Sequence, residues 1–135
     1  MSNRVYHIIN TVFGGIILCI FIYSLIFHGN NHPVPALLTD ITGIIPPSKG
    51  LSSSFSEIVR GNLDEALTLN PHSIRIFAFF LIQLLTRILV SITVEANWIK
   101  QNRVIIIDIF FSILLFGICF APLIEYTFRL FTKFL

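Results

Sequence analysis

The sequence predicts an all-α integral membrane protein, with three transmembrane helices and amphipathic interfacial helices between the first and the second. Of its 135 residues, 55% are hydrophobic and only 12% are charged, about half the charged fraction of a soluble domain. The apolar residues are also clustered in runs of about 20, the length of helix that crosses a bilayer. We therefore expect a single membrane domain, residues 1–135, in contact with the lipid bilayer.

The first span is expected over about 5–27, because this stretch contains no charged side chain. Its apolar run is longer than the hydrophobic region of a signal peptide, which argues against cleavage. Glycine, asparagine and proline in residues 28–33 then end the helix. Within the span, Gly14 and Gly15 favour close packing against a neighbouring helix.

The second span is expected over about 73–95 and the third over about 104–124. A short polar stretch, residues 100–103, joins them, so the two helices should form an antiparallel hairpin. Pro122 interrupts the third span. Proline kinks a membrane helix more often than it ends one, because neighbouring groups can satisfy the freed carbonyl. We therefore expect the helix to continue past Pro122 and to leave the membrane at the interface.

Residues 36–70 are expected to form an interfacial segment with two short amphipathic helices. From Leu51 the apolar residues recur at helical spacing, with Ser52 or Ser53 available as N-cap and Gly61 as C-cap. Asn62 is expected to cap a second short helix, with an acidic residue three positions later. We expect this segment to be ordered on the membrane surface.

The same segment resembles a known family. It reads Thr42-Gly43-Ile44-Ile45-Pro46-Pro47-Ser48-Lys49-Gly50-Leu51-Ser52-Ser53-Ser54, then Arg60-Gly61-Asn62-Leu63-Asp64-Glu65-Ala66-Leu67, and then Asn70-Pro71. This pattern resembles domain-of-unknown-function family 2752, a family of small bacterial membrane proteins. The resemblance implies a shared backbone shape and a bacterial inner-membrane location, but no activity is assigned to the family. The matching motif positions are Gly43, Pro47, Gly50, Gly61, Asn70 and Pro71.

The chain also departs from the family motif. Pro46 and Lys49 stand where the family has two cysteines, and Ser52 and Ser53 replace a threonine and an arginine. Metal or thiol chemistry that a cysteine pair would support is therefore not expected here, and no cofactor is expected.

Arg87 and Asp108 place opposite charges within the second and third spans, and Gln83 lies one turn before Arg87 on the same face. Charges inside a membrane usually face a partner or a water-filled cavity. Counted from the turn near residue 100, the axial offset between Arg87 and Asp108 is about 7 Å, which an arginine side chain can cover. We predict that they pair across the hairpin. The alternative is that Arg87 snorkels to the interface.

Other polar groups are expected to have structural roles. Cys19 and Cys119 could share a depth in the membrane, but no disulfide is expected. His28 and His32 have the i, i+4 spacing of zinc ligands, but the intervening glycine and asparagines disfavour a helix there. Lys49 and the serines around it could form a Ser-Lys dyad, although serines before a helix act more simply as caps.

The sequence shows no constellation of acid, base, nucleophile and metal ligands, so we expect a protein that is not an enzyme. A formal net charge of +2 gives no reason to expect a nucleic-acid partner. We expect a non-catalytic accessory or assembly subunit of a larger bacterial inner-membrane complex, with a membrane-protein partner or as a homo-oligomer. The alternative is a homo-oligomeric pore or small transporter in which Arg87 and Gln83 line the path. A membrane-embedded enzyme using Lys49 comes third. The distribution of Lys and Arg favours a cytoplasmic middle segment and C-terminus.

Overall fold

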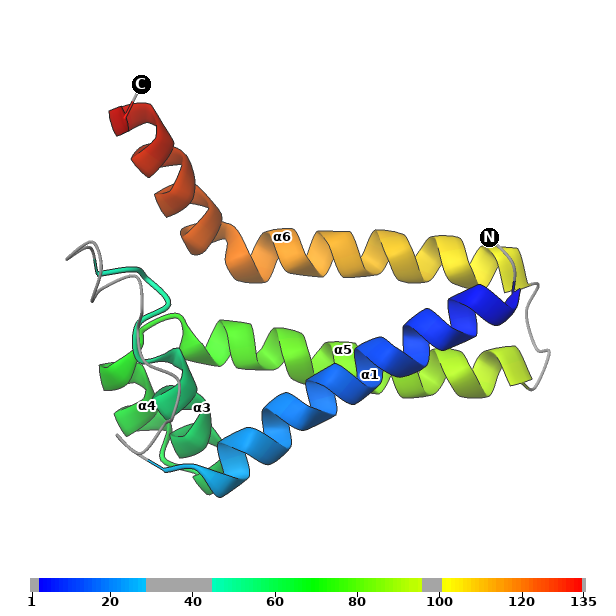
Figure 1. Cartoon of the computed structure of the whole chain (residues 1–135), viewed down its shortest axis with the longest axis horizontal. Coiled ribbons are helices and arrows are strands. Elements are labelled where there is room, and N and C mark those ends of the chain that lie inside the picture. Colours follow the sequence, from blue (N-terminus) through cyan, green and yellow to red (C-terminus); the bar gives the residue numbers. More distant parts are fainter. Residues whose placement is uncertain (1–2, 29–44, 96–100, 135) are drawn as a thin grey trace.

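A computed structural model of the chain describes residues 3–28, 45–95 and 101–134. Its long helices are α1 (Asn3–Ile26), α5 (Ser73–Glu95) and α6 (Gln101–Phe134), and its short helices are α3 (Leu51–Arg60) and α4 (Leu63–Leu69) (Figure 1). The described residues contain no β-strand. All three long helices are long and apolar enough to cross a membrane. The chain is therefore an all-α, multi-pass membrane protein, as predicted. Gly43 and the other residues 36–44 of the expected interfacial segment lie outside the described residues.

α5 is the central helix of the bundle. α1 and α6 each pack against it, and α5 and α6 form the expected antiparallel hairpin (Figure 1). α1 crosses α5, so the beginnings of α1 and α6 lie at one end of the bundle, whereas the end of α1 diverges from α6 at the other (Figure 1). α3 and α4 pack against each other and against α5 at this second end.

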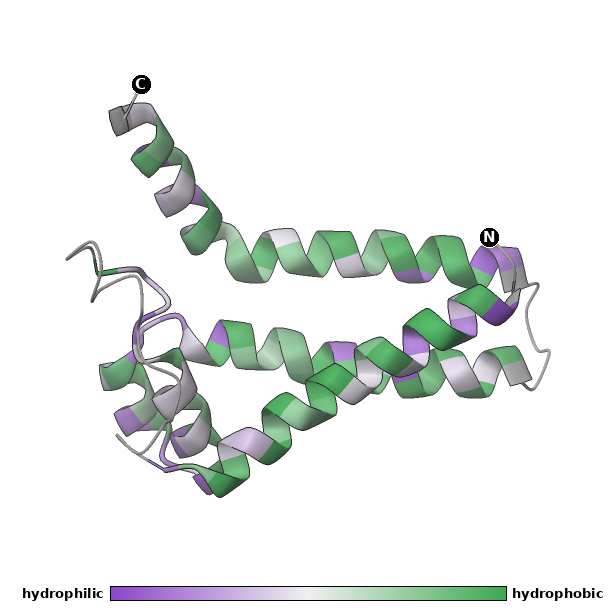
Figure 2. Ribbon diagram, in the orientation of Figure 1, coloured by the Kyte–Doolittle hydropathy of each residue, from purple (hydrophilic) through white to green (hydrophobic). Residues whose placement is uncertain are grey.

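The hydropathy of the helices follows this arrangement. Figure 2 shows the three long helices as mainly hydrophobic, whereas α3 and α4 carry a mixture of hydrophobic and hydrophilic residues. In α3, Phe55 is buried while Arg60 is exposed, as expected of an amphipathic helix. The prediction of two short amphipathic helices between the first two spans therefore agrees with the structure.

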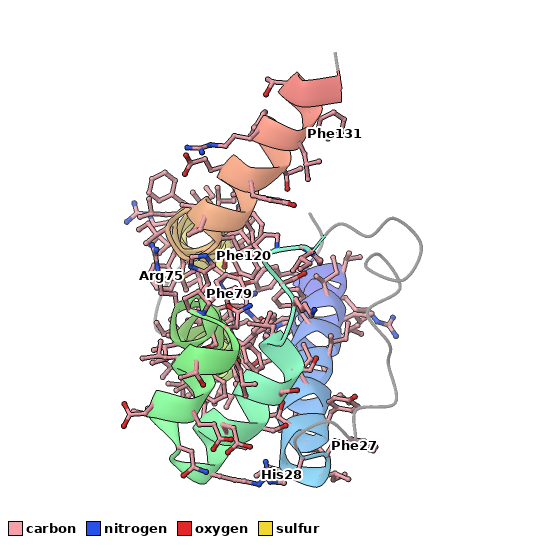
Figure 3. The ribbon with its side chains drawn as sticks, turned by 90° about the vertical axis from the view of Figure 1, so that its left-hand side faces the viewer. Phe27, His28, Arg75, Phe79, Phe120 and Phe131 are labelled. Carbon is pink, nitrogen blue, oxygen red and sulfur yellow. The ribbon has the colours of Figure 1, made fainter. Side chains whose placement is uncertain are left out.

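Different side chains pack at the two ends of the bundle. Where α1 and α6 begin, the buried core consists mainly of aliphatic residues around the ring of Tyr6. At the other end, aromatic rings meet edge to face. Phe55 of α3 lies 5.3 Å from Phe77 of α5, centroid to centroid. Phe79 of α5 lies 5.1 Å from Phe120 of α6, and Figure 3 shows these two residues next to each other. Each such pair contributes about 0.5–1.5 kcal/mol beyond its buried area. The rings therefore tie α3 to α5 and α5 to α6.

The capping prediction for α3 is wrong. α3 begins at Leu51 and its N-cap is Gly50, which has a left-handed φ of 77°, so neither Ser52 nor Ser53 takes that position. A turn before the helix explains the difference, because the Leu51 amide donates to the Ser48 carbonyl at 3.2 Å and the chain enters the helix directly from that turn. Gly61 is the C-cap, as expected.

Arg60 joins α3 to the C-terminal end of α1. Its Nη2 donates to the Leu25 carbonyl at 3.1 Å and its Nη1 to the Ser24 carbonyl at 3.4 Å. Ser56 Oγ adds a bond to the Phe27 carbonyl at 2.8 Å. The last carbonyls of a helix have no partner within the helix and carry the negative end of its dipole, so a cation is well suited to this position.

α6 runs through Pro122 as a continuous helix to Phe134, longer at both ends than the expected span 104–124. Its last part turns away from the bundle, and Phe131 on this part points away from the other helices (Figures 1 and 3). An exposed ion pair joins Arg129 Nη2 to Glu125 Oε1 at 2.5 Å. A bent end that carries both charged and aromatic residues suits the membrane interface.

Pro122 leaves one backbone carbonyl of α6 without a hydrogen-bond donor inside the helix. Pro122 has no amide hydrogen, so the carbonyl of Ile118, four residues earlier, loses its normal donor. Arg75 at the start of α5 supplies the replacement, because its Nη2 donates to the Ile118 carbonyl at 2.9 Å (Figure 3). Arg75 therefore supplies the hydrogen bond that the Ile118 carbonyl cannot receive from Pro122.

We expect Arg75→Gln to lower the free energy of unfolding by about 1 kcal/mol, the typical contribution of such a hydrogen bond. In a Pro122→Ala background the new amide can donate to the Ile118 carbonyl, so the same change should cost less than about 0.5 kcal/mol. Unfolding in mixed micelles measures both. Equal losses in the two backgrounds would show that Arg75 does not act through this carbonyl.

Candidate functional site

Polar side chains from all three long helices meet inside the bundle, and we call them the polar cluster. On each helix they are spaced four residues apart, so they lie on one face. Five of them are buried, with Gln83 0% and Arg87 8% exposed, whereas the two serines are half-buried. The members are Tyr6 and Asn10 of α1, Gln83, Arg87 and Ser91 of α5, and Asp108 and Ser112 of α6.

The centre of the polar cluster is the ion pair between Arg87 and Asp108. Arg87 Nη1 donates to Asp108 Oδ2 at 2.8 Å, and Arg87 Nη2 pairs with Asp108 Oδ1. Two parallel bonds between a guanidinium and a carboxylate are the strongest form of this contact. The predicted pairing is confirmed. The alternative of snorkelling is wrong, because the Arg87 side chain is only 10% exposed and points into the bundle.

The Arg87 guanidinium has further partners around this pair. Nη1 donates to Asn10 Oδ1 at 3.1 Å, and Nη2 donates to Gln83 Oε1 at 3.2 Å and to Ser112 Oγ at 3.0 Å. The guanidinium carbon also lies 5.7 Å from the centre of the Phe13 ring, within the range of a cation–π contact. Gln83 lies one turn before Arg87 on the same face of α5, as its spacing indicates, and the hydrogen bond between the two side chains is an addition from the structure.

α1 joins the polar cluster through Tyr6 and Asn10. The Tyr6 hydroxyl donates to Asp108 Oδ2 at 2.7 Å. Asn10 Nδ2 donates to the Arg87 carbonyl at 3.1 Å and to Ser91 Oγ at 2.9 Å. Gly14 continues this face of α1: a Cβ there would lie 3.6 Å from Arg87 Cβ, which fits the expected close packing.

Sequence reasoning missed Tyr6, Asn10, Ser91 and Ser112. The sequence does contain a signal for them, which is the spacing of four residues that places side chains on one helix face. Ser91 follows Arg87 by four positions, Ser112 follows Asp108 by four, and Asn10 follows Tyr6 by four. Gly15 behaves differently from its neighbour Gly14: a Cβ at Gly15 would meet nothing within 4 Å. The expectation of close packing therefore holds for Gly14 alone.

Among the described motif positions, Asn70 is the centre of a second set of buried contacts. Asn70 is 2% exposed, and its Nδ2 donates to the carbonyls of Pro47 and Lys49, each at 2.8 Å. Its Oδ1 accepts from the His72 amide at 2.9 Å, across Pro71. Asn70 therefore holds the turn before α3 against the start of α5.

The two motif glycines occupy backbone conformations that other residues rarely adopt. Gly50 has φ 77° and Gly61 has φ 88°. A Cβ at Gly50 would lie 2.6 Å from the carbonyl oxygen of Leu69, whereas one at Gly61 would meet nothing within 4 Å. Gly50 is therefore required both by its φ and by the close approach of the end of α4.

The remaining sequence candidates take structural positions. Cys19 is exposed, Cys119 is buried, and both are free thiols. His28 Nδ1 lies 3.1 Å from Oε1 of Glu57, a buried carboxylate of α3, while His32 lies outside the described residues. Ser54 Oγ lies 2.9 Å from the Gly50 carbonyl oxygen and 3.0 Å from the Ala66 carbonyl oxygen, so its one hydroxyl proton is shared between them and links α3 to α4.

The polar cluster joins the three long helices to one another through hydrogen bonds between their side chains. Its opposite charges neutralise each other, and each long helix contributes at least two hydrogen-bonding side chains. Among the described residues no group of three or more metal-ligating side chains is found. Comparison of the chain with protein-family models, with curated proteins and with solved structures gives no match.

Proposed function

We propose that this chain is a non-catalytic accessory or assembly subunit of a larger bacterial inner-membrane complex. The observation that carries the proposal is the outer surface of α6. On its first part Ile106, Phe110 and Ile113 are each at least 66% exposed, and on the part beyond Pro122 Phe128 is 68% exposed. The first part of α6 is straight and packs against α5 on one side, so a partner helix can pack along its exposed apolar face (Figure 1).

The polar cluster supports the same proposal. The two charged side chains inside the spans, Arg87 and Asp108, bond to each other and to side chains of α1. These contacts hold α1, α5 and α6 together. A rigid bundle with an apolar outer face is suited to lateral association in the bilayer. The resemblance of the middle segment to a family of small bacterial membrane proteins supports the bacterial inner-membrane location.

Site-specific photo-crosslinking in native membranes tests the proposal. A crosslinker at Phe110, on the exposed face of α6, should give one discrete product with a different membrane protein, and that protein should co-purify with the chain in a fixed ratio. Ile22, exposed on α1, is the matched control position and should give little of this product. Products with lipid alone at both positions would contradict the proposal.

A homo-oligomeric pore or small transporter is the second candidate function. The observation that favours it is that Gln83 Nε2 and Arg87 Nε are buried donors without a hydrogen-bond partner in the described residues. Such donors can bind water or a polar solute in transit. Under this alternative, photo-crosslinks from Phe110 would join two copies of the chain, and purified protein in liposomes would pass a solute at a rate that Gln83→Leu reduces.

A further inference from the structure

A groove on the middle segment lies between the turn before α3 and the start of α5. Its volume is about 520 Å³. Apolar side chains supply much of its wall, among them those of Pro46, Pro47, Leu69 and Pro71, while Lys49 and His72 are polar lining residues. The groove is therefore amphipathic, with apolar walls beside a cationic group.

The charge of the groove has one sign. Lys49 is cationic, His72 can donate a hydrogen bond in its neutral form and is positive when protonated, and none of the described lining residues is acidic. The first turns of α3 and α5, which begin at Leu51 and Ser73, add partial positive charge close by. An anionic ligand meets no opposing carboxylate in the wall.

The backbone beneath Lys49 is fixed before any ligand binds. Asn70, itself buried, donates to the carbonyls of Pro47 and Lys49. The Lys49 amide also donates to the Pro46 carbonyl at 3.0 Å, which closes the turn. A fixed backbone lowers the entropy that a ligand must overcome on binding.

The position of the groove selects the ligand. It lies where α1 ends and α5 begins, at the end of the apolar spans, and this is the level at which lipid headgroups meet the hydrocarbon. We propose that the groove binds the phosphate-bearing headgroup of an anionic lipid, with Lys49 as the cationic contact and His72 as the second polar contact. The apolar walls accommodate the glycerol and the start of an acyl chain. This inference is independent of the proposed function.

Native mass spectrometry of the full chain in maltoside micelles tests the proposal. The protein is mixed with equal amounts of phosphatidylglycerol, which is anionic, and phosphatidylcholine, which is zwitterionic. Wild-type protein should retain phosphatidylglycerol preferentially. Lys49→Gln should reduce that retention about fivefold, the effect expected of one lysine at a lipid surface, and Lys49→Arg should preserve it.

Arg103→Gln is the matched control, because Arg103 is exposed at the opposite end of the bundle and its loss changes the net charge equally. It should leave retention within about twofold, since it lies outside the groove. An equal loss in Lys49→Gln and Arg103→Gln would overturn the proposal, as would equal retention of the two lipids by wild type. Displacement of the lipid by excess inorganic phosphate would assign the groove to a free anion and overturn the lipid assignment.

Discussion

Asp108→Asn and Arg87→Gln are each expected to lower the free energy of unfolding by about 3 kcal/mol, because each leaves the opposite charge unpaired inside a membrane bundle. The bidentate contact between the two residues makes each the main counter-charge of the other. The double substitution removes both charges together. Its loss should fall short of the sum of the single losses by about 2 kcal/mol, the signature of a directly coupled pair.

Unfolding by sodium dodecyl sulfate in mixed micelles, followed by circular dichroism, gives the four free energies of this cycle. Arg129→Gln is the control, because its ion pair with Glu125 is formed by side chains that are 78% and 63% exposed. That substitution should change stability by less than about 0.5 kcal/mol. Strict additivity of the Arg87 and Asp108 losses would refute the coupling. The stability that the polar cluster contributes would then come from its neutral members.

The sequence was sufficient to predict the spans and the central ion pair. Hydropathy determines the spans, because only long apolar helices satisfy their backbone within a bilayer. The partner of Arg87 followed from the short hairpin turn, which fixes the relative depth of α5 and α6. The continuation of α6 through Pro122 followed in the same way from the known tolerance of membrane helices for proline.

The sequence could not predict the position of α1 in the polar cluster. α1 is connected to the hairpin through a long segment, so neither its depth nor its rotation about its own axis is constrained by a short turn. Only the packed structure brings the Tyr6 hydroxyl to Asp108 and Asn10 to Ser91. The same holds for Arg75, whose role depends on its distance from the carbonyl that Pro122 leaves free.

The start of α3 was mispredicted for a local reason. Serine is a strong N-cap, so Ser52 and Ser53 were the natural candidates. The turn before the helix decides the N-cap instead. The Ser54 amide donates to the Gly50 carbonyl at 2.9 Å, which is the first hydrogen bond of the helix, and Gly50 is therefore the N-cap. Its left-handed φ allows the chain to reverse beside the end of α4, which a capping preference alone does not reveal.

That turn yields the second large expected effect: Gly50→Ala should lower the free energy of unfolding by about 3 kcal/mol or more. A left-handed φ costs a non-glycine residue about 1–2 kcal/mol. The new methyl would in addition lie 2.6 Å from the Leu69 carbonyl oxygen, a backbone atom at the end of α4 that cannot move without shifting Asn70. Hydrogen exchange should therefore accelerate across α3 and α4 together, more than in the centre of α5.

Gly61→Ala separates the two causes. Gly61 has the same backbone requirement, with φ 88°, but a Cβ there meets nothing within 4 Å. Its substitution should therefore cost only about 1–2 kcal/mol, the conformational part alone. Equal losses at Gly50 and Gly61 would mean that the turn relaxes away from α4 at no cost. A larger loss at Gly50 would show that the close approach of α4 makes glycine necessary at this motif position.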